Sequence, residues 1–422
     1  FPYKFISEQE NVIQQLEDRF KSAEQFQDEI NELKKNQLDL TKNWFQFELN
    51  FKNNNRDIQL KKIEKIELSN KKIMERYQVS NAVYAGMGAY IDFHKDNFFF
   101  LSAASGILGF SDNYSEKLNF KQIKNNLNDF VDIDQFIIHN SYSFRDLYIN
   151  ENKIFISFVE QIRDNCWNTS VVHGKIDYEI IKFQKLFSSK DCINHEGTPA
   201  SGGRIVNYDN NNILLTVGEF HSSFLSQDKE SINGKIIKIN KDSSEYKIIS
   251  MGHRNPQGLY LDIENNFILE TEHGPQGGDE INLIEIEKIN RGENLNYGWP
   301  VVSAGEHYGG RDKKNEEKYK KYPLYKSHSE HGFIEPLKSF VPSIGISEIT
   351  KITGENRYVL GSMGKNRIGD KSIYFFELDN KKKIINLEQV KVFQRVRDLT
   401  YKDDKLYILF ESPLVIGEIS LN

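Results

Sequence analysis

The sequence lacks several features that would place it in a broad class of protein. Among its 422 residues no apolar run approaches the length of a membrane-spanning helix, about 18 residues, so no membrane span is expected. A basic excess is also missing: the formal net charge is −6, which argues against a nucleic-acid partner. The first residues, FPYKFISEQE, include no initiator methionine. That fits removal of a signal peptide or anchor, although a trimmed chain would look the same. We therefore expect a periplasmic or secreted protein, or one tethered to a membrane by a removed N-terminal segment.

Cysteine is scarce, with only Cys166 and Cys192, and neither lies in a Cys-x-x-Cys motif or a Cys/His cluster. Their separation, with loop-like sequence between them, permits a disulfide, which would indicate an oxidising compartment. Two buried free thiols are the alternative. We predict the disulfide, because these are the only cysteines of a chain that we expect to be exported.

Residues 1–75 are predicted to form an N-terminal helical extension. Between residues 6 and 40, apolar side chains recur at spacings of three and four, as on one face of an amphipathic helix. A helix packed on its own domain fits this stripe, and so does a coiled coil through which the chain self-associates.

The end of this extension changes in texture. A short strand is indicated by the alternation of Phe45, Phe47, Leu49 and Phe51. The Lys-rich segment that follows, with Ile63, Ile66 and Ile73, is predicted to be a second helix that leads into the main domain, residues 76–422.

The main domain repeats one short pattern, in which a polar turn precedes three to five apolar or aromatic residues. Six copies recur at spacings of roughly 50 residues: 95–101, 151–157, 210–216, 264–270, 355–361 and 403–409. A repeated β-hairpin unit produces such a pattern, and radial repetition of small sheets protects their edge strands. We therefore predict an all-β, six-bladed β-propeller with a loop insertion between residues 285 and 350. A β-sandwich with insertions is the alternative.

Three turn-forming segments lie close together in the second half of the chain: 252-GHRNPQGL-259, 271-TEHGPQGGDEINLI-284 and 296-NYGWP-300. Arg254 offers a planar fork of donors for carboxylate or quinone oxygens, and the Asn255-Pro256 turn would hold it in place. The carbonyls of Gly274-Pro275 and the carboxylate of Glu280 are oxygens of the kind that calcium binds. Each segment alone would fit a plain tight turn.

These three strings resemble, nearly letter for letter, the soluble quinoprotein glucose/sorbosone dehydrogenases, or aldose sugar dehydrogenases. Weaker similarity covers roughly residues 84–422, including 202-GGRIVNYDNNNILLTVGE-219, 234-GKIIKI-239 and 395-RVRDLTYKDDKLYIL-409. The resemblance implies a six-bladed propeller that binds pyrroloquinoline quinone (PQQ) and calcium and oxidises a small sugar.

The resemblance also implies roles for individual residues. Arg254 and Asn255 would contact the quinone and the substrate, as catalytic and cofactor-binding residues. The carbonyls of Gly274 and Pro275 would hold the calcium that polarises the quinone. Arg395, Arg397 and Lys365 would bind the carboxylates of PQQ, and Tyr308 would contact the cofactor. Glu280 and the backbone of Tyr297 would bind a second, structural calcium. A tricarboxylate needs several fixed cations, which agrees with this set.

The sequence departs from the family at two positions. Where the family has a histidine that takes the proton of the anomeric hydroxyl, the string 198-TPASGGRI-205 has Ala200, which cannot act as a base. Where the family has a cofactor-contacting glutamine, a loose alignment of 140-NSYSFRD-146 places Ser141. His195 is a candidate substitute base, although a lone loop histidine is more often a surface residue. Two hypotheses follow: a PQQ-dependent sugar dehydrogenase with weakened or lost activity, or a non-catalytic propeller that serves as an exported binding or structural module.

Overall fold

The computed structural model describes residues 49–53, 56–65, 88–103, 106–111, 120–131, 144–194, 200–364, 371–411 and 414–421. The helix expected over residues 6–40, with its self-association, lies outside these ranges, and so does the predicted division after residue 75. No helix in the described ranges is both long and apolar enough to cross a membrane.

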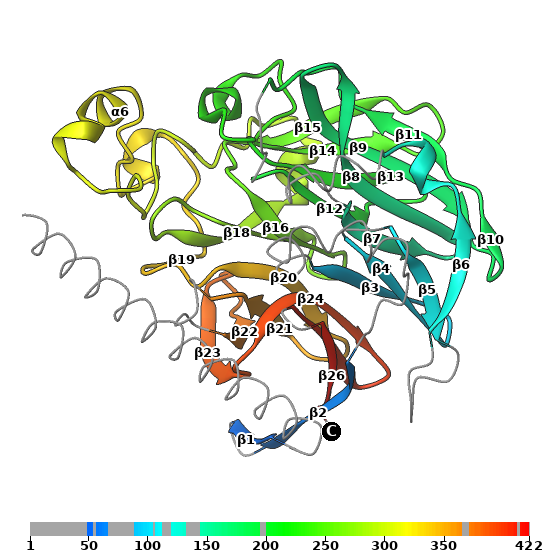
Figure 1. The fold of residues 1–422 in the computed structure, drawn as a ribbon. Coiled ribbons are helices and arrows are strands. Elements are labelled where there is room, and N and C mark those ends of the chain that lie inside the picture. The colour runs from blue at the N-terminus through cyan, green and yellow to red at the C-terminus, as the bar shows by residue number, and fades with distance from the viewer. Residues whose placement is uncertain are drawn as a thin grey trace, which may run out of the picture. The chain divides into compact units, whose positions relative to one another are not determined.

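Six β-sheets of four or five strands each make up most of the described part of the chain (Figure 1). Their innermost strands, β3, β7, β12, β16, β20 and β24, lie side by side in that order, and β24 returns to β3. The sheets are therefore the blades of a closed ring, which confirms the predicted six-bladed β-propeller and leaves no support for a sandwich.

The first three blades contain strands from residue 89 to residue 251. The first blade holds β3 (Ala89–His94), β4 (Asn97–Ser102), β5 (Leu108–Ser111), β6 (Lys121–Asn125) and the parallel β10 (Ile180–Ile181). The second holds β7 (Phe144–Asn150), β8 (Lys153–Arg163), β9 (Cys166–Lys175) and β11 (Gln184–Ser188). The third holds β12 (Gly202–Asn207), β13 (Asn212–Val217), β14 (Lys235–Asn240) and β15 (Tyr246–Met251).

The other three blades complete the ring. The fourth holds β16 (Pro256–Asp262), β17 (Phe267–Glu272), β18 (Asp279–Glu285) and β19 (Lys338–Phe340). The fifth holds β20 (Ile346–Ile352), β21 (Arg357–Ser362), β22 (Ser372–Leu378) and β23 (Ile384–Lys391). The sixth holds β24 (Arg395–Lys402), β25 (Lys405–Glu411), β26 (Val415–Ser420), β2 (Arg56–Lys65) and β1 (Leu49–Asn53).

The repeated sequence pattern marks the same place in every blade, namely the turn into the second strand. These second strands are buried along almost their whole length, as in β4, β13, β17, β21 and β25. Each blade packs between two others, so both faces of its second strand are covered by apolar side chains. This explains why the pattern is a continuous apolar run and not an alternation.

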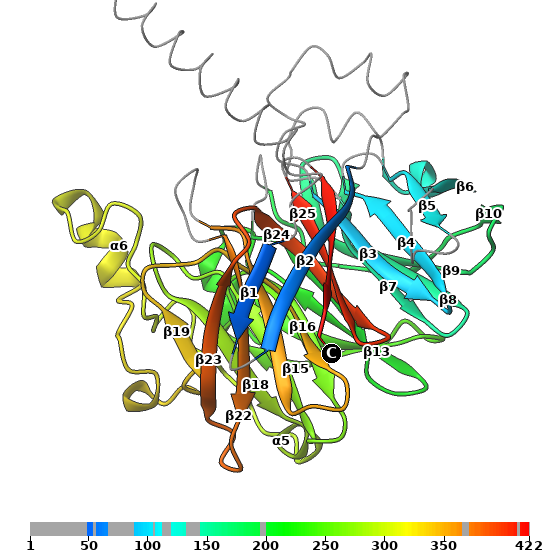
Figure 2. The same cartoon turned by 90° about the horizontal axis from the view of Figure 1, so that it is seen from below.

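The sixth blade joins the two ends of the described chain (Figure 2). β2 pairs antiparallel with β26, the last strand, with Gln59 opposite Ser420 and Lys65 opposite Val415. The helix predicted for the Lys-rich segment is therefore wrong over Arg56–Lys65. The free edge of β26 offers backbone hydrogen bonds that only a strand can use, and this outweighs the local preference of a Lys-rich segment.

Irregular connections carry the short helices. These are η1 (Leu127–Asp129) and η2 (Ser223–Gln227) and, between β18 and β19, α5 (Ile286–Asn290), η3 (Lys313–Asn315), α6 (Glu316–Lys321) and η4 (Ser329–His331). The insertion expected between residues 285 and 350 is thus present, and it belongs to the fourth blade.

A register shift recurs near the start of five of the six innermost strands. The shifts fall between Phe144 and Asp146, Gly202 and Ile205, Pro256 and Gly258, Ile346 and Ile349, and Val396 and Asp398. Such bulges re-aim side chains and are common beside active sites. The residues within or beside the shifts include Arg145, Arg204, Gln257, Glu348 and Arg397, so polar side chains gather where the innermost strands meet.

A disulfide joins Cys166 to Cys192, with their Cα atoms 4.9 Å apart, as predicted. Backbone hydrogen bonds pair the neighbouring residues, Trp167 and Ile193, at 3.0 and 3.1 Å. The bond therefore fastens the start of β9 to the segment that leads towards β12.

We expect Cys166→Ser/Cys192→Ser to lower the free energy of unfolding by about 3.5 kcal/mol, because the bond closes a loop with a sequence separation of 26 residues in the unfolded chain. Urea unfolding of the variant and the wild type measures this difference. Thiol titration of the denatured, unreduced wild type should find no free thiol before reduction and two after it. Two free thiols before reduction would contradict the pairing.

Candidate functional site

Arg254 lies in the link between β15 and β16, and its side chain is buried, with 8% of its surface exposed. One terminal nitrogen donates hydrogen bonds to the carbonyl oxygens of His273, at 3.1 Å, and Gly274, at 2.8 Å. The guanidinium also lies 5.4 Å from the ring centre of Trp299. Its Nε is buried and has no hydrogen-bond partner among the described residues. A buried donor of this kind needs an acceptor, which a ligand oxygen can provide.

Asn255 connects Arg254 to the centre of the ring. Its Oδ1 accepts hydrogen bonds from the backbone N–H of Gly202, at 3.3 Å, and from Nε2 of Gln257, at 3.0 Å. Arg397 in turn donates to Oε1 of Gln257 at 3.5 Å. The third, fourth and sixth blades therefore meet through one chain of hydrogen bonds at this point.

Arg395 and Arg397 share a single buried carboxylate on β25. Both donate to Glu411, through Nε at 3.0 Å and 2.5 Å respectively. Although burial would raise the pKa of Glu411, the adjacent guanidinium groups of Arg397 and Arg395 hold this pKa below its usual value. Two cations balanced by one anion leave a surplus positive charge, which suits an anionic ligand.

The turn at Gly274 is bent sharply because a carboxylate holds it. Oδ1 of Asp279 accepts from the backbone N–H of Gly274 at 3.2 Å, while its Oδ2 accepts from three successive N–H groups of the fifth blade, those of Ile344, Gly345 and Ile346. A Cβ atom at Gly274 would lie 2.0 Å from the carbonyl oxygen of Gly278, so the turn requires glycine.

His273 fixes the other side of this turn. Its Nε2 lies 2.6 Å from the carbonyl oxygen of Ile346, so this nitrogen carries the proton, and Nδ1 lies 3.4 Å from Nδ2 of Asn255. Burial lowers the pKa of His273, which keeps the ring neutral at pH 7. The side chains of His273, Asp279, Gln257 and Glu411 were missed as site residues. The first three lie inside the motifs singled out from the sequence, whereas nothing in the local sequence marks Glu411.

The structure places Glu280 and Tyr297 in the interior of the fourth blade. Burial, together with the charge of Glu272, raises the pKa of Glu280 well above its usual value, and Oε1 of Glu280 lies 3.6 Å from Nε2 of His328. The Tyr297 hydroxyl donates to the carbonyl of Leu283 at 2.6 Å. Their shared role in binding calcium stays a prediction.

Tyr308 lies on the surface of the insertion, with 61% of its area exposed. The loop that carries it is bound to the Gly274 turn, because Gln276 and Glu306 exchange backbone hydrogen bonds at 2.8 and 2.9 Å. The neighbouring N–H of Gly309 also donates to Oε1 of Gln276 at 3.1 Å. Tyr308 is thus held near that turn, open to a ligand from solvent.

Ala200, the position of the missing base, belongs to the same region as Arg254. Its backbone has a positive φ of 67°, and its carbonyl accepts a hydrogen bond from Phe220. The adjacent Glu219 donates its N–H to the carbonyl of Arg254 at 2.9 Å. The predicted site residues His195, Lys365 and Ser141 lie outside the described residues.

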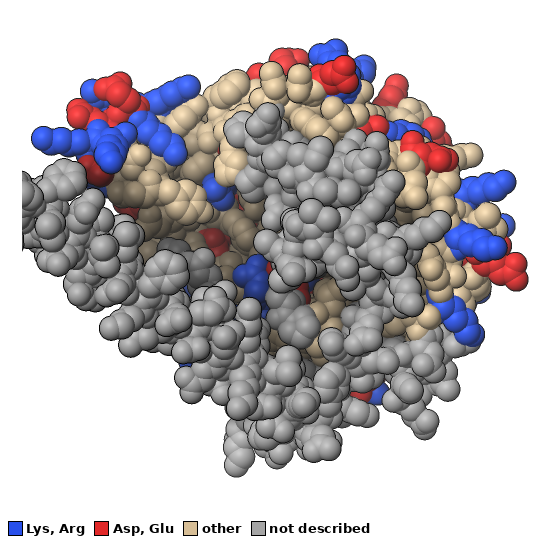
Figure 3. Space-filling view, in the orientation of Figure 1, with Lys and Arg blue, Asp and Glu red and all other residues tan. Residues whose placement is uncertain are grey.

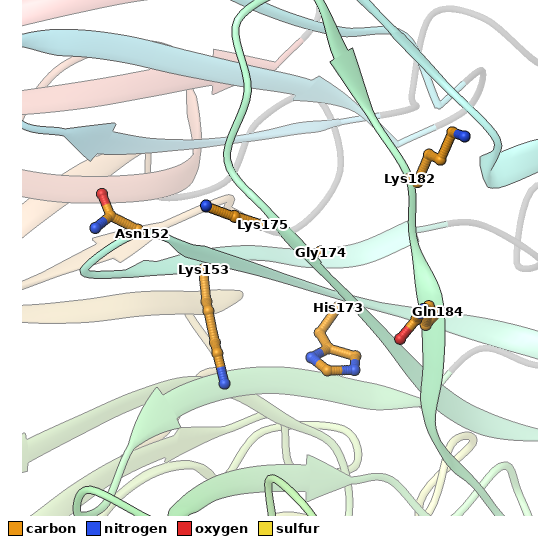
Figure 4. A pocket seen from close by; sticks show the side chains of 7 residues that line it. All are labelled: Asn152, Lys153, His173, Gly174, Lys175, Lys182 and Gln184. Carbon is orange, nitrogen blue, oxygen red and sulfur yellow. The ribbon is translucent and has the colours of Figure 1, made fainter.

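The centre of the propeller face is hollowed, and both basic and acidic side chains are visible in the hollow (Figure 3). A different pocket, of about 410 Å³, lies in the second blade and is lined by Asn152, Lys153, His173, Gly174, Lys175, Lys182 and Gln184 (Figure 4). Lys153 and His173 point to one side of it, whereas Lys175 and Lys182 point elsewhere. Because its cations do not converge, we do not assign the cofactor to this pocket.

Comparison with known proteins identifies the family of the propeller. The model of the glucose/sorbosone dehydrogenase family matches residues 142–414. An uncharacterized protein from Synechocystis sp., slr1608, is 30% identical over 233 residues, which cover 49% of this chain and 52% of that protein. Aldose sugar dehydrogenase YliI from Escherichia coli is 28% identical over 182 residues, 39% of this chain and 46% of that protein. The chain therefore matches about half the length of these relatives.

Solved structures agree on the fold. The soluble aldose sugar dehydrogenase of Escherichia coli in its apo form has a TM-score of 0.66 at 20% identity, covering 86% of this chain and 100% of that one. The PQQ-bound form of aldose sugar dehydrogenase from Streptomyces coelicolor has a TM-score of 0.60 at 16% identity, covering 86% and 98%. With the family match over most of the propeller and this shared fold, the chain belongs to the glucose/sorbosone dehydrogenase family.

Proposed function

We propose that this protein binds PQQ and calcium in the central hollow, as an aldose sugar dehydrogenase whose turnover is weakened by Ala200. The observation that carries the proposal is the buried guanidinium of Arg254, whose Nε lacks a partner among the described residues. A quinone or carboxylate oxygen would satisfy that donor. The surplus charge of Arg395 and Arg397 offers a second point of attachment for a tricarboxylate, and Lys365 is a proposed third.

Calcium would bind at the carbonyls of Gly274 and Pro275, which are hard oxygen ligands of the kind that this ion prefers. The Gly274 carbonyl accepts a hydrogen bond from Arg254. A carbonyl oxygen has two lone pairs, so Gly274 can bind calcium while it still accepts from Arg254. Glu280 and the Tyr297 backbone are the proposed ligands of the structural calcium.

When bound, PQQ supplies the two-electron acceptor for oxidation of an aldose at its anomeric carbon. The residues of this chain would hold and orient the reactants: Asn255 is fixed by Gly202 and Gln257, and Arg254 is fixed by the Gly274 turn. Ala200 can hold no proton. Because a positioned base contributes about 10²- to 10⁴-fold in rate, we expect slow turnover unless His195 takes its place.

The second candidate is a non-catalytic, exported binding module, and Ala200 is the observation that favours it. Cofactor affinity and proton abstraction rest on different residues, so the two candidates differ in turnover more than in binding. Export and a role of the N-terminal segment in assembly remain part of this proposal.

Replacement of Arg397 with glutamine tests cofactor binding alone. We expect Arg397→Gln to weaken PQQ affinity, in the presence of calcium, by at least about tenfold, because one charge-assisted contact is lost. Isothermal titration measures the affinity. Arg357→Gln is the matched control, since Arg357 pairs with Glu388 at 3.3 Å on β23, the outermost strand of the fifth blade. Equal affinities for the two variants would argue against the proposed pocket.

Replacement of Ala200 with histidine tests the missing base. An imidazole has an ordinary pKa of about 6.5, which suits a base at neutral pH. Histidine also tolerates the positive φ of this position better than most residues do. With PQQ and calcium bound, we expect Ala200→His to increase dye reduction by an aldose by at least about tenfold. Ala200→Asn, which also tolerates this backbone but is no base, is the control.

Two outcomes would change this account. If the wild type binds no PQQ and Ala200→His stays inert, the binding-module candidate is correct. If the wild type is already fast, another base is present, and His195→Ala should abolish its activity.

A further inference from the structure

A second group of ionisable side chains lies inside the fourth blade, next to the segment that carries Arg254. It consists of His253, Glu270 and Glu272, whose exposed fractions are 0%, 0% and 3%. One nitrogen or oxygen atom from each lies within 4.8 Å of the others. Nδ1 of His253 is 3.4 Å from Oε1 of Glu272 and 3.8 Å from Oε2 of Glu270.

The two carboxylates are placed together by the strand itself. Glu270 and Glu272 are two residues apart on β17, so their side chains point to the same face of the sheet. They pair with Asn282 and Glu280 of β18. Within the described residues, neither Glu270 nor Glu272 forms an ion pair with a lysine or arginine. Two adjacent buried carboxylates without a cation are costly, so the cluster requires a positive charge from outside the protein or a shared proton.

Unsatisfied polar atoms provide a separate indication. Oε1 of Glu270 and Oδ1 of Asn282 are buried and have no hydrogen-bond partner in the described structure. The amide nitrogen of Asn282 donates to both carboxylates, at 3.0 Å each, and so orients them towards the same space. A buried carboxylate oxygen such as Oε1 of Glu270, left without a donor, is explained by a bound cation or water.

The histidine is oriented as a metal ligand would be. Its Nδ1 lies 3.4 Å from Oε1 of Glu272 and can donate to it, while Nε2 can accept from the hydroxyl of Ser250 at 2.8 Å. When Nδ1 binds a metal ion instead, the ring proton moves to Nε2 and Oγ of Ser250 becomes its acceptor. Metal-binding histidines usually donate their other N–H to an oxygen in this way. Donor atoms around a tetrahedral zinc ion lie about 3.4 Å apart at bond lengths of about 2.1 Å. The spacings of 3.4 and 3.8 Å are close to this value.

We propose that His253, Glu270 and Glu272 bind a divalent transition-metal ion, of which zinc is the model. The imidazole nitrogen favours such an ion over calcium, which prefers oxygen ligands alone. His253 directly precedes Arg254, whose backbone N–H donates to Oε2 of Glu272 at 2.5 Å. The ion would thus fix the backbone at Arg254, and its binding does not depend on whether the protein oxidises sugars.

The test uses the full chain stripped of metal with a chelator. We expect zinc to raise the melting temperature of the wild type by at least about 3 °C, since a ligand in large excess stabilises the folded state that binds it. Glu270→Gln keeps an acceptor for Asn282 but removes a charged ligand, so it should lose the shift and bind zinc at least about tenfold more weakly by titration. Glu285→Gln is the control. Glu285 lies at the end of β18 and pairs with Lys288 and Lys382, away from the cluster, so this variant should keep the zinc-induced rise in melting temperature.

Three results would overturn the proposal. The first is a wild type whose melting temperature zinc does not raise, and the second is a zinc-induced rise that persists in Glu270→Gln. The third is a calcium-induced rise that is larger than the zinc-induced one and is lost in Glu270→Gln. If Glu270→Gln does not fold, cobalt added to the stripped wild type decides the matter. A visible absorption band that one equivalent of zinc abolishes supports the site, and no band excludes it.

Discussion

Arg204 is the point at which the ring of blades is held together. From β12 its guanidinium contacts Asp146 at 2.9 Å, Asp398 at 2.8 Å and Glu348 at 2.8 Å, and it also donates to the carbonyl oxygen of Gln257 at 2.7 Å. Five of the six blades therefore meet at one buried side chain. Loss of the cation would leave three buried carboxylates with backbone N–H donors but without this cation, and breaking a single buried ion pair already costs about 3–5 kcal/mol.

The candidate site depends on the same construction. Strand irregularities of the same kind lie beside Gln257, which contacts Asn255, and beside Arg397, which contacts Gln257. The Gly274 turn reaches the fifth blade through Asp279. The predicted ligand contacts come mainly from the fourth blade and from β24 of the sixth, which meet only because the ring closes between β24 and β3.

Much of this could be predicted from the sequence, because turn and strand chemistry is local. The repeated turns predicted the number of blades, and the motifs around Arg254 and Gly274 indicated the candidate site, whose ligands stay a prediction. Contacts between distant blades could not be predicted in this way. Glu411 is the partner of Arg395 and Arg397 only through pairing of β24 with β25, and Arg56–Lys65 becomes a strand only because β26 offers a free edge. Nothing in the alternation of Glu270 and Glu272 alone shows that His253 faces both.

The central claim is that a quinone cofactor binds in the hollow where the blades meet. A density map of the protein reconstituted with PQQ and calcium tests it most directly. The account predicts PQQ between Arg254 with Asn255 on one side and Arg395 with Arg397 on the other. It also predicts an ion at the Gly274 carbonyl. A map without PQQ, or with PQQ bound only in the pocket beside Lys153, would contradict it.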